Sequence, residues 1–458
     1  MKRPSQAGRI WLPGTPGFDE AVLSSSFNGS DPGVRPKVYV EANNDQDVID
    51  AVKRAAREGL RVSVCSGGHS WMQNHLRDGN LLINCARLNT VKVDTDARTA
   101  IAGPGCWSVD LDSALRKHGL FFPIAHAEDV CLGGFLLQGG FGWNSRNLGL
   151  ACESVIGIDV VTAQGELIHA NAQQHADLYW AARGSGPGFF GVVLRYHLRV
   201  HARPRVTAIA MQVFRMRHLE EVFQWAEAVG PEVPRTVEFQ LLLTGNATGV
   251  FAPGIEVIAP VLTDSWREAR AATAFLTRGP LRKKASLRLP TIPISTTLMS
   301  RMAARRIFPP RMRWSVDNMW TNAPMQQLLP GLRAIADSMP PMPSHVLFMS
   351  WHPPKERPDM AFSVEGKHYL ALYGEWRDAA DDAKYGSWAT DHMQAMAPMS
   401  VGIQLADENL ARRPGRFMSA ENHAKVERIR AQYDPQGLFH TWRGADRRAD
   451  ATMGREIA

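Results

Sequence analysis

The sequence predicts an α+β fold with two domains and a C-terminal segment that returns to the first domain. Apolar runs typical of strands alternate with amphipathic helical runs from residue 38 onward. This pattern changes near residue 205 and again near residue 411. A chain of 458 residues is also too long for one ordinary core. We therefore expect a first domain over 1–205, a second over 206–410 and a returning segment over 411–458.

The first domain is expected to open with a strand at 38–40 and an amphipathic helix over 45–58. Asn44 or Asp45 is suited to be the N-cap of this helix, and Gly59 to end it. Further strands are expected at 61–65, 81–85, 91–94 and 191–203, a hairpin-like pair at 156–170, and a second short helix at 108–119.

The second domain mixes helices and strands and is richer in proline and methionine. Helices are expected at 219–230 and 265–279, and strands at 236–243 and 368–376. The tail at 419–442 has the pattern of a helix followed by a turn. The sequence contains no internal repeat and no low-complexity segment.

Charge and hydropathy exclude several classes of protein. The net charge is +7, and the densest basic stretch, 278–313, contains no acidic residue. We interpret this stretch as a solvated surface. The alternative is a positive surface that attracts an acidic ligand or carrier. We expect no nucleic-acid partner. No run approaches the roughly 20 apolar residues that span a bilayer. The basic N-terminus has no continuous apolar core, so we expect a cytoplasmic protein.

The five cysteines favour neither a disulfide framework nor a metal centre. They are odd in number, lie about 20 residues apart, and form no CxxC or Cys/His cluster with zinc spacing. We expect most of them to be reduced and buried, as free thiols usually are. No metal site is expected from the sequence.

Three glycine-rich segments carry the strongest chemical signal. The first, SGGHSW at 66–71, directly follows an expected strand, where consecutive glycines let backbone N–H groups approach a phosphate. The others are GGFLLQGGFG at 133–142 and RGSGPGFFG at 183–191. None has the spacing of a dinucleotide-binding Rossmann fingerprint or of a P-loop, which disfavours an NAD or ATP site.

The order of these motifs resembles the berberine-bridge-enzyme-like flavoproteins, a branch of the vanillyl-alcohol-oxidase class. The resemblance extends from about Gly14 to Phe439 and includes IGIDVVTAQGE, DLYWAARGSGPGFFGVV and the late YDPQGLF. It implies a PCMH-type FAD-binding domain in two α+β parts, completed by the C-terminal segment. It also implies a substrate domain of antiparallel sheet covered by helices.

The resemblance implies FAD as the cofactor, bonded covalently through His69. Such a bond to the flavin 8α-methyl carbon withdraws electron density and makes the flavin a stronger hydride acceptor. The residues that the resemblance assigns to cofactor binding are Ser66, Gly67, Gly68, His69, Ser70, Gly133, Gly134, Gly139, Gly140, Gly142, Ser145 and Asn422.

A single covalent link is expected. Many relatives carry a second link through a cysteine, but Ala127 occupies that position here. Cys131, four residues later, is the alternative second tether, with a buried packing thiol as the plain interpretation. His126 is more simply a loop histidine than a flavin ligand.

The catalytic residues are harder to assign, because the chain departs from the family. Leu148 and the segment around Ile403 stand where relatives often have tyrosines. The candidates that remain are Tyr369, Tyr373 and Glu375, which share one face of the expected strand at 368–376, and Gln404 on a neighbouring expected strand. A tyrosine or glutamate there can take a substrate proton while hydride leaves for the flavin.

The sequence therefore predicts an FAD-dependent oxidase that takes hydride from a small alcohol, amine or phenolic substrate and passes the electrons to O₂. The first alternative is a biosynthetic tailoring oxidase or oxidative cyclase for an aromatic or polyketide-like substrate. A dehydrogenase with another acceptor is a further alternative, because Leu132 is bulky enough to restrict oxygen access. A non-catalytic flavin-binding protein remains the alternative from a different class.

Overall fold

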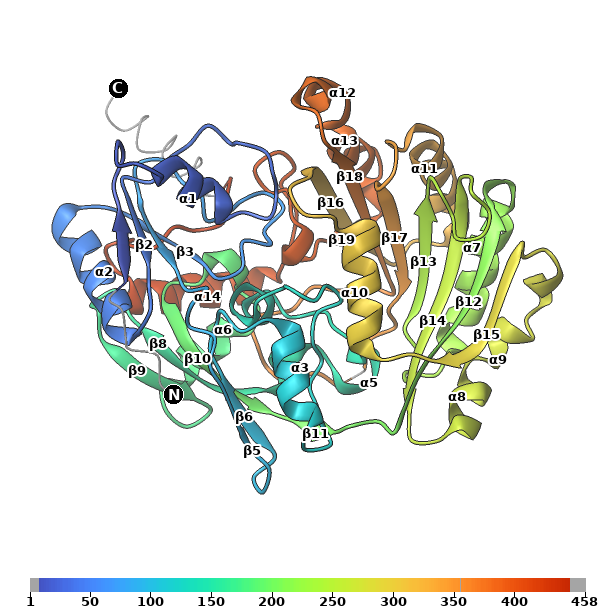
Figure 1. Cartoon of the computed structure of the whole chain (residues 1–458), viewed down its shortest axis with the longest axis horizontal. Helices are drawn as coiled ribbons and strands as arrows, with labels where there is room; N and C mark the ends of the chain where they lie inside the picture. The colour runs from blue at the N-terminus through green and yellow to red at the C-terminus, as the bar shows by residue number, and fades with distance from the viewer. Residues whose placement is uncertain (1–7, 355, 445–458) are drawn as a thin grey trace.

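The computed structural model describes residues 8–354 and 356–444 of the chain and divides into two lobes (Figure 1). The first lobe holds a mixed four-stranded sheet and an antiparallel five-stranded sheet, and the second holds one large antiparallel sheet. None of the helices in the described residues is long and apolar enough to span a bilayer. All five cysteines are free and buried, as expected.

The first sheet has the strand order β1-β2-β4-β3, with β2 and β3 both parallel to β4. Its strands are β1 (Arg9–Trp11), β2 (Val38–Glu41), β3 (Val62–Cys65) and β4 (Leu81–Asn84). Helix α2 (Asp45–Glu58) follows β2, and the Asn44 side chain accepts a hydrogen bond from the Asp47 amide, so Asn44 is its N-cap. Gly59 ends α2 in a left-handed conformation, at φ 63°. The helix and its stop are confirmed.

The second sheet of this lobe is antiparallel, in the order β5-β6-β10-β8-β9. Its strands are β5 (Val91–Asp94), β6 (Thr99–Ala102), β8 (Val155–Val161), β9 (Leu167–Asn171) and β10 (Val192–Arg199). Strands β8 and β9 form the expected hairpin. The remaining elements are α1 (Phe18–Ser24), α3 (Ser108–Arg116), β7 (Leu120–Phe121), α4 (Leu132–Leu137), α5 (Ser145–Leu148), α6 (Ala176–Ala182) and β11 (His201–Ala202).

The second lobe is built on an eight-stranded sheet in the order β15-β12-β14-β13-β17-β18-β16-β19. Its strands are β12 (Val206–Arg215), β13 (Phe239–Thr244), β14 (Gly254–Thr263), β15 (Leu287–Pro293), β16 (Arg313–Thr321), β17 (His345–Ser350), β18 (His368–Trp376) and β19 (Ser400–Gly402). Its helices are α7 (Leu219–Val229), α8 (Trp266–Ala272), α9 (Ala274–Thr277), α10 (Thr296–Ile307), α11 (Met325–Ser338), α12 (Asp382–Tyr385) and α13 (Trp388–Ala395).

The two faces of this sheet pack against different partners. On β18, Leu370 and Leu372 join the core made with α7, α11 and α13. Tyr369, Ala371 and Tyr373 point to the other face and join a cluster that includes Trp71 of the first lobe. The sheet therefore has one helix-covered face and one face that meets the first lobe, which is the antiparallel substrate-domain architecture that the resemblance implied.

The C-terminal segment lies against the first lobe. Helix α14 (Ala420–Tyr433) packs on α6, and Phe439 forms a parallel bridge with Val62 at the edge of the first sheet. Helix α10 of the second lobe also contacts the first lobe, because the Trp143 indole N–H donates to Ser300 Oγ at 3.0 Å. The segments that bound the site thus come from the whole length of the chain.

The basic stretch 278–313 is partly neutralised within the fold. Its ion pairs are Lys284 with Glu221, Arg301 with Glu128, Arg306 with Glu256, and Arg313 with Asp382. These carboxylates lie on other segments, which is why the sequence run alone suggested a larger positive field. The local pairing favours the interpretation of a solvated surface.

Candidate active site

A cavity with an atom-free volume of about 1850 Å³, its open mouth included, lies where the two lobes meet. All three glycine-rich segments contribute to its walls, together with β17, β18, the segment 404–407 and the bridge residue Phe439. The predicted site residues that line it are Ser66, Gly67, Gly68, His69, Ser70, Gly133, Gly134, Gly140, Tyr369, Tyr373 and Gln404. Residues separated by more than 300 positions in sequence therefore share one cavity.

The loop after β3 requires glycine for steric reasons. Gly68 has φ +69°, and a Cβ placed there would lie 1.9 Å from the Ser25 carbonyl oxygen. A Cβ on Gly67 would lie 2.7 Å from Cys131 Sγ. Within the described part of the chain, the backbone N–H groups of Gly67 and His69 have no backbone acceptor. Such free N–H groups on a glycine turn form a concavity suited to a phosphate.

His69 is held in this loop by two contacts. Its Nε2 lies 3.1 Å from Asp129 Oδ1, and its ring stacks on Phe27 with centroids 4.2 Å apart. Burial alone would raise the pKa of Asp129, but the hydrogen bond and charge of His69 outweigh it, and the pKa is lowered. The ionised carboxylate therefore fixes the ring and leaves Nδ1 available.

Four predicted cofactor residues do not line the cavity. Gly139 and Gly142 sit in the turn after α4, where a Cβ on Gly142 would lie 2.4 Å from the Ile124 oxygen, and Ser145 Oγ accepts from the Gly142 amide at 2.9 Å. Asn422 donates to the carbonyl oxygens of Met360 and Ala361, at 2.9 and 3.2 Å. Ser145 therefore braces the turn between α4 and α5, and Asn422 ties α14 to the segment 360–361.

The part of the cavity that lies against β18 is organised around Asp407, which the sequence did not single out. Its Oδ2 accepts hydrogen bonds from the hydroxyls of Tyr369 and Tyr373, at 2.5 and 2.9 Å. Its Oδ1 accepts from the Trp71 indole N–H at 2.6 Å. Burial raises the pKa of Asp407, and the three donors offset only part of that effect. Asp407 is thus an acid with a raised pKa inside the cavity, which is typical of a proton-transfer group.

The one signal for Asp407 in the sequence is its position. It is an acidic residue close to Ile403, where relatives often have a tyrosine. The segment around Ile403 was expected to be a strand, but β19 ends at Gly402. Gln404 instead caps the short 3₁₀ helix Leu405–Asp407, with its side-chain oxygen accepting from the Ala406 amide. The strand expected at Gln404 is therefore wrong, because this local cap bends the chain inward and delivers Asp407 to the cavity.

Glu375 lies away from the cavity. It is 1% exposed, and its Oε1 is 3.1 Å from His345 Nδ1. Burial raises the pKa of Glu375 to about 10 and lowers that of His345 to about 4, so both are neutral at pH 7. His345 in turn stacks on Tyr373 with ring centroids 4.6 Å apart. Glu375 supports the wall from behind.

Cys131, Ala127 and His126 all line the cavity. The Cys131 thiol donates weakly to the Gly105 oxygen at 3.4 Å, and burial raises its pKa. A thiol must ionise to act as a nucleophile, so this environment opposes bond formation at sulfur. His126 Nε2 lies 2.8 Å from Glu238 Oε2, a hydrogen-bond partner from the second lobe.

The residues present fit an FAD molecule. The glycine loop supplies free N–H donors, and a Cβ built on Gly134 would meet nothing within 4 Å, which leaves the wall open for a close approach. The Asn74 side-chain oxygen is buried at the cavity without a hydrogen-bond partner among the described residues. Buried polar groups are normally satisfied, so this oxygen is a candidate acceptor for a polar group of the cofactor.

Comparisons with known proteins agree with this fit. Residues 36–171 match the FAD binding domain family. The chain is 31% identical over 446 residues to the FAD-linked oxidoreductase nodO of Hypoxylon pulicicidum, covering 93% of this chain and 95% of that protein.

Two solved structures share the fold along nearly the whole chain. The crystal structure of 6-hydroxy-D-nicotine oxidase from Arthrobacter nicotinovorans has a TM-score of 0.80 at 22% identity and covers 96% of this chain and 98% of its own. The Physcomitrella patens protein BBE-like 1 has a TM-score of 0.81 at 19% identity. The match covers 94% of this chain and 96% of that protein.

Proposed function

Because the chain belongs to the FAD-linked oxidoreductases of the berberine-bridge-enzyme-like family, we propose that it is an oxidase for a small organic substrate, with O₂ as the final electron acceptor. The observation that carries this proposal is Asp407, a buried acid that two tyrosines and a tryptophan position in the cavity. When bound, the FAD supplies the two-electron acceptor to which substrate hydride passes.

In this proposal, Asp407 is the general base. Its carboxylate takes the proton from a substrate O–H or N–H as hydride leaves the carbon that bears this group or, in a phenol, a carbon attached to the ring. Tyr369 and Tyr373 orient the carboxylate and stabilise its charge through their hydroxyl donors. The raised pKa of Asp407 brings its proton affinity closer to neutral pH, where a general base is most effective.

His69 holds the cofactor in this proposal, by a single covalent bond through Nδ1. Its Nε2 is engaged by Asp129, so Nδ1 is the ring nitrogen free to react. The raised pKa of Cys131 and the methyl side chain of Ala127 support one link and no second one.

The substrate is proposed to be flat and largely apolar, with one ionisable O–H or N–H. Phe308, Phe141, Met349 and Trp71 line the cavity around Asp407. Trp71, Phe308 and Tyr373 also contact one another, with ring centroids 5.8 to 5.9 Å apart. An aromatic alcohol, phenol or amine matches this wall, which also supports the alternative of a biosynthetic tailoring oxidase acting on an aromatic molecule.

The experiment that tests the proposal is a panel of aromatic and aliphatic alcohols, phenols and amines mixed anaerobically with the holoenzyme. A substrate bleaches the flavin absorbance, and air restores it with release of one H₂O₂ per turnover. Bleaching that is restored only by an artificial dye acceptor would support the dehydrogenase alternative. A properly loaded flavin that no member of the panel reduces would support a non-catalytic binding protein.

A further inference from the structure

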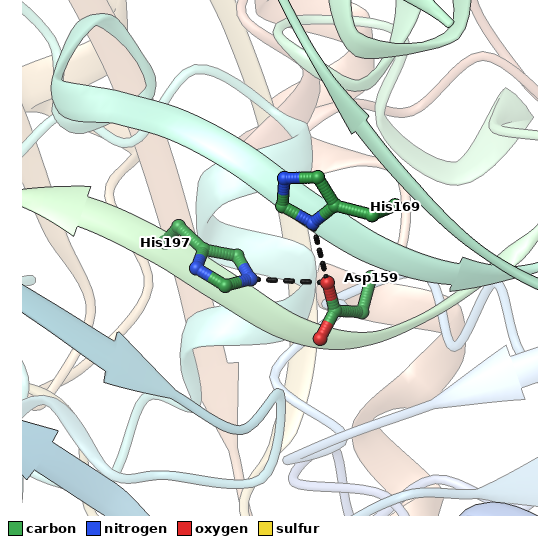
Figure 2. A group of neighbouring side chains, drawn as sticks. All are labelled: Asp159, His169 and His197. Carbon is green, nitrogen blue, oxygen red and sulfur yellow. Dashed lines mark hydrogen bonds and ion pairs between the residues drawn. The ribbon is translucent and has the colours of Figure 1, made fainter. Parts of the chain in front are cut away.

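Three ligand-type side chains meet on the five-stranded sheet of the first lobe (Figure 2). Asp159 lies on β8, His169 on β9 and His197 on β10. In the strand register, Asp159 stands directly opposite His169, and His197 stands opposite Gly157, two residues before Asp159 on the same face. Three adjacent strands therefore bring together side chains that the sequence separates by up to 38 positions.

The two imidazoles converge on one carboxylate oxygen. His169 Nδ1 lies 2.7 Å and His197 Nε2 lies 3.0 Å from Asp159 Oδ1. The three ligand atoms all lie within 4.8 Å of one another, and the two rings are nearly perpendicular, at 86°. Ligands of a tetrahedral zinc ion, bonded at about 2.0–2.1 Å, lie about 3.3 Å apart. Small ring movements would therefore place these atoms at three corners of a tetrahedron.

The space around the His169 ring depends on a glycine. A Cβ added at Gly157 would lie 3.2 Å from His169 Cε1, closer than most real contacts of this kind. The three side chains remain reachable from solvent, with 39% of His169, 24% of His197 and 19% of Asp159 exposed. An ion can thus enter, and a water molecule can complete its coordination.

The Asp159 carboxylate can attract a cation, and the Arg195 guanidinium competes with that cation for the same carboxylate. The Arg195 guanidinium lies 3.3 Å from the other oxygen, Oδ2, and also pairs with Asp45. Oδ1 is therefore left to the two histidines.

We propose that Asp159, His169 and His197 bind one Zn²⁺-class transition-metal ion, with water as the fourth ligand. Two imidazoles and one carboxylate suit zinc, cobalt or nickel, whereas calcium and magnesium prefer sites made of oxygen ligands. The same strand, β10, presents Tyr196 to the cofactor cavity, one residue before His197. The ion would fasten β8, β9 and β10 on the opposite side from the cavity and strengthen this wall of the cofactor domain.

Cobalt titration of the full-length holoenzyme, first freed of metal by chelator, tests the proposal. We expect one Co²⁺ per chain, with visible absorption bands of a tetrahedral ion that Zn²⁺ abolishes, and a higher unfolding temperature in Zn²⁺. His169→Ala and His197→Ala should each weaken Co²⁺ binding at least 10-fold. Losing a residue that only orients a metal ligand already costs about 10-fold, and these two are proposed as ligands themselves. The matched control is His118→Ala, an exposed histidine of the same lobe, which should bind as the wild type does.

Arg195→Gln tests the same site in the opposite direction. Removing the guanidinium beside Asp159 should tighten Co²⁺ binding several-fold, because one positive charge no longer opposes the ion. His197→Asn keeps a hydrogen-bond donor for Asp159 and guards against a folding defect, and retained flavin absorbance confirms that each variant is folded. Absent Co²⁺ uptake, uptake of several ions per chain, or uptake unchanged in the histidine variants would overturn the proposal.

Discussion

Asp407 is the residue on which the proposed chemistry depends. If it is the base, Asp407→Asn should slow flavin reduction by about 10²–10⁴-fold while the FAD content stays normal. Stopped-flow reduction with a substrate from the panel measures this. Asp382→Asn is a matched control, because Asp382 also accepts from a tryptophan indole, that of Trp376 at 2.6 Å, but lies outside the cavity lining.

The pH profile gives an independent readout of the same residue. The pKa of Asp407 is raised above 3.8, so the rate of flavin reduction should fall as the pH is lowered through this raised value. The acidic limb should disappear in Asp407→Asn. A limb that persists unchanged in this variant would assign the base to another group.

His69 decides how the cofactor is retained. His69→Ala should release FAD into the supernatant after acid or SDS denaturation, whereas the wild-type flavin should stay with the chain. Cys131→Ser is the control and should keep the link, because its thiol is buried and its pKa is raised. Peptide mapping that finds flavin on the Cys131 peptide would contradict the single link.

Glu375 is expected to affect stability through its protonation. Its pKa of about 10 in the fold lies above the unfolded value near 4.5, so the native state binds the extra proton between these values. The contribution of Glu375 to the free energy of unfolding should therefore fall as pH rises from about 5 to 9. Glu375→Gln, which mimics the neutral acid, should flatten this dependence in urea unfolding curves measured across that range. An unchanged slope would mean that Glu375 is ionised in the folded protein.

At the scale of single elements, the turn after β3 is the most constrained segment. Gly68→Ala should reduce FAD incorporation and stability, because its Cβ would collide with the Ser25 oxygen. Gly79→Ala is the matched control: Gly79 has φ +65° but nothing within 4 Å of the added Cβ. The Gly79→Ala variant should lose only about 1 kcal/mol of the free energy of unfolding, through backbone strain. Equal losses of FAD in both variants would show that strain rather than collision matters.

Strand β18 shows how one element serves two purposes. Its alternation sends Leu370 and Leu372 into the helix-covered core and Tyr369 and Tyr373 toward the first lobe. The period of two in the sequence predicted which side chains share a face. It did not predict that the two hydroxyls meet a single carboxylate.

At the scale of the whole molecule, the C-terminal segment closes the cofactor domain. Phe439 is 2% exposed, bridges to Val62 and lines the cavity. Phe439→Ala should cost about 3–5 kcal/mol in the free energy of unfolding and lower FAD occupancy, measured by the ratio of flavin to protein absorbance. Phe251→Ala removes a phenylalanine that is 86% exposed and should change neither quantity.

The sequence by itself determined the fold class, the FAD family and the glycine loops. Helix periods, the Asn44 cap and the requirement for glycine after β3 are properties of short segments, and short segments carry their own signal. The missing tyrosines were also visible in the sequence.

The tertiary structure alone decided which groups meet. Trp71 and Asp407 are 336 positions apart, and only the packing of the two lobes brings the indole N–H to the carboxylate. Asp159, His169 and His197 likewise depend on strand order and register. Burial then separates the roles of Glu375 and Asp407, because desolvation and hydrogen bonding depend on three-dimensional neighbours that no local sequence pattern records.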